Sequence, residues 1–218
     1  MSYGAKTRLV SEVLTAVQRQ FGDESGVQLE NSDVIRWVND AQDVIVAKNK
    51  VLKAKSTTPS VAGQAAYTFP SDNIHQIESI HYNGYRVPNM SFAEAESEIF
   101  QADPALIATG DPYLWYEWAG TFTFWPAPGD VKNIDLYYTQ RPTPVTLISD
   151  TLSLPDKYYQ DVVRYCLQQA YEMDEDMANS QAKAQQFDAS LNEKSEEERT
   201  AQNMTYEKIT VYDDDYSW

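Results

Sequence analysis

Cysteine, histidine and basic residues are all scarce in this sequence of 218 residues. The single cysteine, Cys166, excludes an internal disulfide and a zinc site built from cysteine ligands. Only 17 Lys and Arg residues stand against 33 Asp and Glu residues, which gives a formal net charge of -16. A surface this acidic repels DNA phosphates and anionic lipids, which argues against a protein that grips nucleic acid or a membrane.

Long hydrophobic runs are missing as well. Charges interrupt the apolar stretch at the start, MSYGAKTRLVSEVLTAVQRQF, so it lacks the core of a signal peptide. No other run has the length needed to span a bilayer, and we expect a soluble protein. The sequence also has no Walker loop, nucleophile elbow or dinucleotide-binding fingerprint.

The first secondary-structure elements that the sequence predicts are two amphipathic helices. In the first helix, apolar residues recur every four positions over 6–21. The second helix has its N-cap at Asn31, carries its own apolar face and ends near 48–50. We expect these two helices to pack antiparallel against each other, because this buries both apolar faces.

The sequence changes character at about Leu52, where short β-prone segments begin. Strands are predicted at 53–59, 66–69, 74–82, 85–87, 113–118, 121–125 and 134–139. Asn83-Gly84 is a strong signal for a type I′ hairpin turn. A short helix with a capping box between Ser91 and Glu94 is expected to run to about Gln101. Strict alternation in 74–82 predicts one face with Ile74, Gln76, Glu78, Ile80 and Tyr82, and an opposite face with His75, Ile77, Ser79 and His81.

Two more helices and an isolated strand complete the prediction. Leu154-Pro155-Asp156 begins an amphipathic helix whose buried face includes Cys166. The next helix, 176–199, is mostly Ala, Gln and Glu, with Phe187 and Leu191 as its apolar anchors. Residues 206–212 alternate like a strand but have no neighbouring strand in the sequence with which to pair.

This order of elements predicts an α+β fold: a helical bundle built from the N- and C-terminal helices, an inserted antiparallel β-sandwich-like domain, and an extended C-terminal tail. The expected boundaries are 1–51 for the N-terminal helix pair, 52–150 for the β-rich domain with its inserted helix, 151–202 for the C-terminal helices and 203–218 for the tail.

Several residues raise the question of catalysis or metal binding. His75 and His81 share an expected strand face, but they are separated by roughly 20 Å along it, too far for one metal ion. Cys166 lies on a buried helix face without a histidine partner. A glycosidase needs two carboxylates facing each other across a sugar, whereas three glutamates spread around one expected helix: Glu94, Glu96 and Glu98. We therefore expect no catalytic residue, no cofactor and no metal.

Aromatic residues are abundant, with 15 Tyr, 7 Phe and 5 Trp. Exposed aromatic platforms stack on sugars, so a glycan-binding or peptidoglycan-cleaving module is an alternative function. Strand alternation sends about half of the clustered aromatics into a core, and the remainder suit contacts with another protein. The cluster comprises Trp115, Tyr116, Trp118, Phe122, Phe124 and Trp125.

Taken in order and spacing, several segments resemble the head-to-tail adaptor proteins of tailed bacteriophages, which are also called connector, gatekeeper or tail tubular A-type proteins. The segments are YTFPSD from Tyr67, IESIHYNG from Ile77, TGDP from Thr109, FWPAP from Phe124, LYYTQRP from Leu136 and LPDKY from Leu154. WVNDAQ, from Trp37 in the second expected helix, resembles the same group. The likeness covers nearly the whole chain.

The resemblance implies a structural, non-enzymatic protein of the virion, made in the host cytoplasm and located in the neck between the capsid portal and the tail. Its copies would form a dodecameric ring that docks on the portal protein and extends the DNA channel. A downstream tail or nozzle protein would attach below, and no membrane would be involved. Because each copy is acidic, we expect a net acidic lumen through which DNA passes without specific binding. A neck or tail-completion protein with a similar sandwich is an alternative within the same particle.

The expected contact residues lie in the tail and in two loops. A β-prone segment without a sheet of its own is suited to add to the exposed sheet edge of a partner. We expect the following residues to bind the portal: Tyr206, Ile209, Val211 and Tyr212, with Trp218 as a terminal anchor. The loops near Tyr85 and Trp118 are expected to contact tail proteins.

Overall fold

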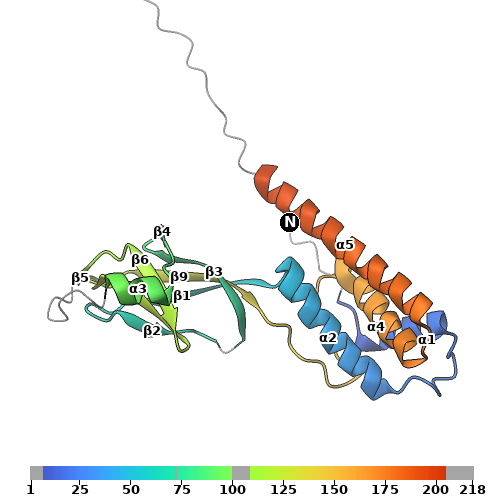
Figure 1. The fold of residues 1–218 in the computed structure, drawn as a ribbon. Coiled ribbons are helices and arrows are strands. Elements are labelled where there is room, and N and C mark those ends of the chain that lie inside the picture. The colour runs from blue at the N-terminus through green and yellow to red at the C-terminus, as the bar shows by residue number, and fades with distance from the viewer. Residues whose placement is uncertain (1–6, 72, 100–108, 205–218) are drawn as a thin grey trace, which may run out of the picture. The chain divides into compact units, whose positions relative to one another are not determined.

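The computed structural model describes residues 7–71, 73–99 and 109–204. It contains helices and antiparallel sheets, so the predicted α+β class is confirmed. The chain forms two compact units (Figure 1). One is Lys50–Thr143 and contains the strands; the other consists of the helical segments that precede Lys50 and follow Thr143.

The first two helices follow the apolar periodicity of the sequence. α1 (Val10–Phe21) ends where Gly22 adopts a left-handed φ of 94°, and α2 (Asn31–Asn49) follows after a loop. The carboxylate of Asp23 organises that loop. It accepts hydrogen bonds of 2.9 to 3.0 Å from three backbone amides, those of Val27, Gln28 and Leu29.

α4 (Tyr159–Met173) is the centre of the helical unit. A 3₁₀ turn at Asp156–Tyr158 leads into it, and α1, α2 and α5 (Met177–Met204) each pack mainly against it. Contrary to the predicted pairing of the first two helices, α1 and α2 contact each other only slightly. Both helices bury their apolar faces on α4 instead, whose own buried side chains include Val162, Val163, Cys166, Leu167 and Ala170.

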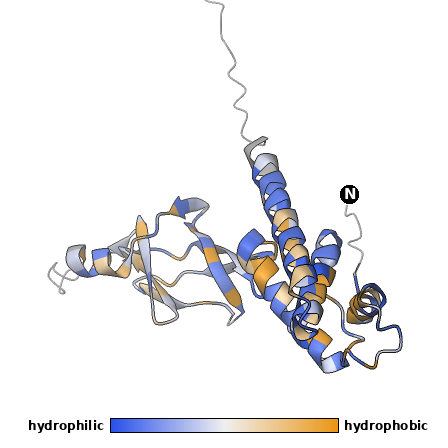
Figure 2. Cartoon of the chain, turned by 45° about the vertical axis from the view of Figure 1, so that its right-hand side comes forward, coloured by the Kyte–Doolittle hydropathy of each residue, from blue (hydrophilic) through white to orange (hydrophobic). Residues whose placement is uncertain are grey.

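α5 is hydrophilic along most of its length (Figure 2). It is anchored by the two apolar residues that the sequence predicted: Phe187 is 5% exposed and Leu191 is fully buried. The rest of the helix must therefore be held by polar contacts or remain in solvent.

The β unit contains two sheets that enclose one core, as the predicted sandwich requires. The larger sheet has the order β1 (Lys53–Pro59), β9 (Asn133–Gln140), β3 (Ile74–Tyr82) and β4 (Tyr85–Val87). The smaller has the order β2 (Ala66–Thr68), β7 (Thr121–Trp125) and β6 (Leu114–Trp118). A short parallel pair joins β5 (Thr109–Gly110) to β8 (Ala127–Pro128). Both main sheets supply the core, which includes Tyr67, Ile80, Trp115, Phe124 and Leu136.

Two tight hairpins fix the strand register. The central residues of both turns have positive φ: 51° and 82° at Asn83 and Gly84, and 49° and 76° at Ala119 and Gly120. This is the backbone signature of the type I′ turn that Asn83-Gly84 predicted.

β3 departs from the strict alternation predicted for it. Two register shifts against β9, between Ile74 and Gln76 and between Ile77 and Ser79, each insert one extra residue into β3. Ile74, Ile77 and Ile80 consequently all pack against the sandwich core. The predicted faces are wrong between the two shifts, where Ile77 turns to the core, whereas Ile74, Ile80 and Tyr82 share the core side as predicted, because the second inserted residue reverses the effect of the first.

α3 (Phe92–Glu98) covers the outer face of the smaller sheet. Its predicted capping box between Ser91 and Glu94 is confirmed. The helix packs on Tyr116 through Ala95 and Ile99. The expected extension of the helix to Gln101 lies outside the described residues.

Candidate functional site

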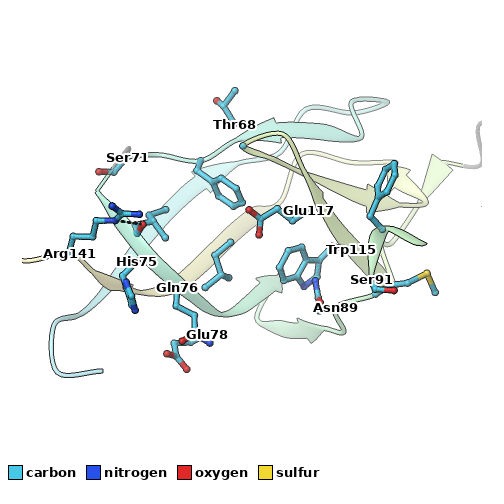
Figure 3. Close-up of a pocket in the computed structure, with 16 residues that line it drawn as sticks. Thr68, Ser71, His75, Gln76, Glu78, Asn89, Ser91, Trp115, Glu117 and Arg141 are labelled. Atoms are coloured by element: carbon cyan, nitrogen blue, oxygen red, sulfur yellow. Dashed lines mark hydrogen bonds between the residues drawn. The ribbon is translucent and has the colours of Figure 1, made fainter. Parts of the chain in front are cut away.

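A groove of about 870 Å³ runs along one edge of the larger sheet (Figure 3). One wall is the unbroken run 74–78 of β3, and the other includes Trp115 and Glu117 of β6. Every residue of this run lines the groove, and β9 occupies the other edge of β3 along it, so the groove lies at the edge of β3 that β9 leaves free.

β4 leaves this edge of β3 uncovered. β4 pairs only with Ile80, His81 and Tyr82, whereas β9 pairs with β3 from Ile74 to Tyr82. Within residues 7–71, 73–99 and 109–204, no strand pairs with 74–79 on the side of β4. The groove thus occupies the place that a longer β4 would fill, where backbone N–H and C=O groups can accept a further strand.

Trp115 fixes the position of the apolar part of the groove. Its indole Nε1 donates a hydrogen bond of 3.1 Å to the carbonyl oxygen of Val87, and its backbone N–H donates one of 3.0 Å to that of Pro88. These bonds tie β6 to the segment that continues from β4. The Trp115 side chain is 5% exposed and forms the floor, to which Phe69 and Phe92 add apolar surface.

The charged groups of the groove are separated along it. Arg141 lies at one end, where its Nε donates to the carbonyl oxygen of Ile74 at 3.4 Å, and Glu117 projects near the middle (Figure 3). Among the described residues, no carboxylate forms an ion pair with Arg141. Glu78, by contrast, pairs with Lys50 at 3.6 Å. Arg141 therefore offers a cation to an incoming group.

The glutamates of α3 do not form a catalytic pair. The Glu94 carboxylate accepts hydrogen bonds from the backbone N–H and the hydroxyl of Ser91, at 3.0 and 2.7 Å. These bonds lower the pKa of Glu94 and commit it to capping the helix. Glu96 is exposed on the same helix, and the side chain of Glu98 lies outside the described residues.

The aromatic cluster is divided between core and surface. Trp115, Phe122 and Phe124 are at most 5% exposed, so they cannot serve as a stacking platform for sugars. Trp118 is 57% exposed and stacks on Phe92, with ring centroids 4.0 Å apart. Within this cluster the glycan-binding alternative therefore depends on the exposed Trp118 and the half-buried Trp125.

The two histidines have different surroundings. His75 lies in the first bulge of β3 and lines the groove. His81 lies with its Nε2 at 3.2 Å from the Ser79 hydroxyl and its ring centroid at 5.0 Å from that of Tyr137. No group of three or more metal-ligating side chains occurs in the part of the chain that the structure describes. Cys166 is fully buried, as predicted, and burial raises the pKa of its thiol.

Tyr85 and Trp118 are both exposed, at 77% and 57%, but they do not form one patch. Asn89, which follows β4, bridges to Trp115 in the parallel sense. Along this shared direction, Tyr85 precedes the bridge and Trp118 lies beyond it, so they are on the order of 20 Å apart. The two side chains therefore lie on separate parts of the surface of the β unit. The expected portal-binding residues Tyr206, Ile209, Val211, Tyr212 and Trp218 lie outside the described residues.

A buried polar cluster in the helical unit escaped the sequence analysis. Asp161 of α4 is fully buried and forms ion pairs with Arg164, at 2.7 Å, and with Lys194 of α5. The hydroxyl of Tyr158, also fully buried, donates to Glu198 of α5 at 3.1 Å, and desolvation raises its pKa. These contacts hold the hydrophilic second half of α5.

Comparison with known proteins identifies one family. The family model described as SU10 adaptor protein matches residues 8–207, which include both the helical unit and the β unit. No curated protein sequence matches the chain. In the three described stretches, no helix is both long enough and apolar enough to cross a bilayer.

Proposed function

Because the chain belongs to the SU10 adaptor protein family, we propose that it is a head-to-tail adaptor of a bacteriophage virion. It works by shape and contact rather than by catalysis. Its copies form a closed dodecameric ring that docks on the portal protein, extends the DNA channel and presents a platform to a downstream tail or nozzle protein. The observation that carries the proposal is the family match, which spans both compact units.

The ring requires two different side surfaces on each copy, because only a heterologous contact repeated by rotation closes into a ring. α5 is suited to one of them. Among its side chains described up to residue 200, the buried apolar anchors are Phe187 and Leu191, and most of the remaining surface is hydrophilic. A helix of this kind fits a wet subunit boundary or the lumen better than a dry core.

The acidic composition suits a channel for DNA. Each copy carries a formal net charge of -16, so a ring of copies repels the duplex and prevents it from adhering during packaging and ejection. We propose that the lumen is net acidic and binds no DNA sequence specifically. A channel dominated by rings of Lys and Arg would contradict this part of the proposal.

In this proposal, the portal protein and the tail proteins bind different parts of the chain. The C-terminal segment attaches to the portal through Tyr206, Ile209, Val211, Tyr212 and Trp218, by adding a strand to an exposed sheet edge. The β unit contacts tail proteins through the surfaces around Tyr85 and Trp118, whose exposed aromatic rings can bury a large area at little entropic cost.

A binding experiment with the portal protein of the same phage tests the proposal. The full chain, a chain ending at Met204 and a chain ending at Ser217 are compared by co-sedimentation with assembled portal. The full chain is expected to bind, the Met204-terminated chain to lose at least tenfold in affinity, and the Ser217-terminated chain to lose less. Undiminished binding after removal of 205–218 would refute the role of the tail, and no binding by the full chain would refute the adaptor function.

A further inference from the structure

We propose that the groove along β3 accepts residues 206–212 from a second copy of this chain by β-strand addition. The acceptor is the uncovered edge 74–79, and the added strand continues the line of β4. This inference goes beyond the proposed function, because it gives the C-terminal segment a binding place on the adaptor itself. Groove and portal then compete for one segment.

The sequence of the C-terminal segment matches the groove in length and pattern. Residues 206–212 read YEKITVY, with Ile209 and Val211 on one side of an extended strand and Lys208 and Thr210 on the other. At about 3.3 Å per residue, the seven residues span about 20 Å, and the open edge 74–79 has a similar length. An added strand gains backbone hydrogen bonds from the edge and selectivity from pockets for alternate side chains.

The walls of the groove suit a strand with one apolar side. Ile77 and Trp115 provide an apolar floor beside the open edge, to which Ile209 and Val211 can turn. Lys208 and Thr210 then remain in solvent.

Charge gives the added strand a direction. Asp213, Asp214 and Asp215 follow the strand directly in the sequence. If the strand runs antiparallel to β3, these carboxylates reach the end of the groove where Arg141 lies beside Ile74. The parallel direction would bring them instead to the end marked by Ser91, where the Glu94 carboxylate is already bound. The antiparallel direction is therefore favoured.

We assign the donor to a second copy, whose segment is not constrained by its short connection to the helix of the accepting chain. Tyr206 is two residues beyond Met204, the last residue of α5, and two residues reach only about 7 Å. Its own groove is accessible only if it lies directly beside the end of α5. A second copy is free of this condition, and the exchange between copies is a heterologous contact of the kind that builds rings.

The first test measures a synthetic peptide of residues 205–218 binding to the chain that ends at Met204. Saturable binding is expected, and a peptide of the same composition with the alternation scrambled should bind at least tenfold more weakly. N-methylation of the Ile209 and Val211 amides is compared with that of the Lys208 and Thr210 amides. In an added strand, one of these two pairs of N–H groups faces β3 and the other faces away from it. One N-methylated peptide should therefore lose about tenfold in affinity, and the other should lose little. Equal effects, or no binding of the original peptide, would overturn the proposal.

The second test reverses the charge at the end of the groove. Arg141→Glu in the Met204-terminated chain should weaken the peptide by about tenfold, and replacing the three aspartates of the peptide by lysines should restore binding to this variant. Arg19→Glu, the same charge reversal at an exposed residue of α1 that does not line the groove, is the matched control and should leave affinity unchanged. Equal effects of both variants would overturn the assignment of the groove end and the strand direction.

The third test concerns the source of the strand. Sedimentation of the full chain should show association that rises with concentration, whereas the Met204-terminated chain and the Arg141→Glu full chain should associate less. A full chain that stays monomeric at every concentration would overturn donation by a second copy. If the peptide does not bind the groove but the Met204-terminated chain loses portal binding, this inference fails and the proposed function stands. If the peptide binds the groove while the truncated chain binds portal normally, the inference stands and the portal role of the tail fails.

Discussion

Asn49, the last residue of α2, donates a hydrogen bond of 3.0 Å from its Nδ2 to the carbonyl oxygen of Leu191 in α5. The same Nδ2 lies 3.4 Å from the hydroxyl of Tyr158. Asn49 is 6% exposed and directly precedes Lys50, where the β unit begins. One amide thus joins three parts of the helical unit at the point where the chain leaves it.

Replacement of Asn49 by alanine is expected to lower the free energy of unfolding by about 1–3 kcal/mol, because it leaves the Leu191 carbonyl without its buried donor. Urea denaturation followed by circular dichroism measures the change. Gln185→Ala, an exposed substitution on α5, is the matched control and should change the free energy by less than about 0.5 kcal/mol. Equal midpoints for the two variants would show that the bond contributes nothing.

Replacement of Asp161 by asparagine is expected to destabilise the helical unit by about 3–5 kcal/mol, since it leaves two cations beside a buried neutral group. Removing one of the cations as well, in Asp161→Asn with Lys194→Met, should cost less than the sum of the single changes. Glu193→Gln, on the exposed side of the same helix, serves as control. Additive single and double changes would contradict the ion pair.

Acid should weaken the loop between α1 and α2 through Asp23. Hydrogen bonds from backbone N–H groups lower the pKa of Asp23 in the folded protein, and the bond from Leu29 has the largest effect. Because the pKa of Asp23 is lower in the folded protein than in the unfolded chain, the carboxylate stabilises the fold at pH values above its unfolded pKa of about 3.9. This stabilisation is lost as the pH falls through the pKa of the folded protein. In Asp23→Asn the stability should vary less between about pH 6 and about pH 2.5. Denaturant midpoints across that range measure the slopes, and identical slopes would refute the assignment.

Tyr85→Ala and Trp118→Ala should have separable effects on binding. Tyr85 is 77% exposed, so its removal should change stability by less than about 0.5 kcal/mol. Because the two residues are on the order of 20 Å apart along the strands, a tail protein that contacts one of them should lose affinity with one variant and not with the other. Interferometry with immobilised adaptor measures this. An equal loss with both variants would show that one partner spans the whole β unit.

The local parts of the fold could be predicted from the sequence. The strands at 53–59, 74–82 and 121–125 agree with the structure residue for residue, because turn residues bound each of them and β-prone residues fill them. The capping box of Ser91 and the buried anchor Leu191 also agree. The family match over 8–207 confirms the resemblance to bacteriophage adaptors, which depended on the order of many short segments.

The non-local parts could not be predicted. The bulges of β3 depend on its pairing with β9, although the spacing of three between Ile74, Ile77 and Ile80 was a usable sign of them. The central role of α4 depends on which apolar faces meet. In the sequence, Asp161 and Lys194 look like ordinary solvent-exposed charges, because their ion pair forms only through the packing of α4 against α5. The open edge beside the groove could have been suspected, because Pro88 limits the strand that follows Gly84 to three residues.

The mass of the complex between the purified chain and assembled portal tests the central claim most directly. Native mass spectrometry of the mixture should give one closed complex that contains the portal and a fixed ring of adaptor copies, twelve if the ring matches our proposal. A chain that stays unbound in the presence of portal, or that adds to it in a continuous range of copy numbers, would contradict the account.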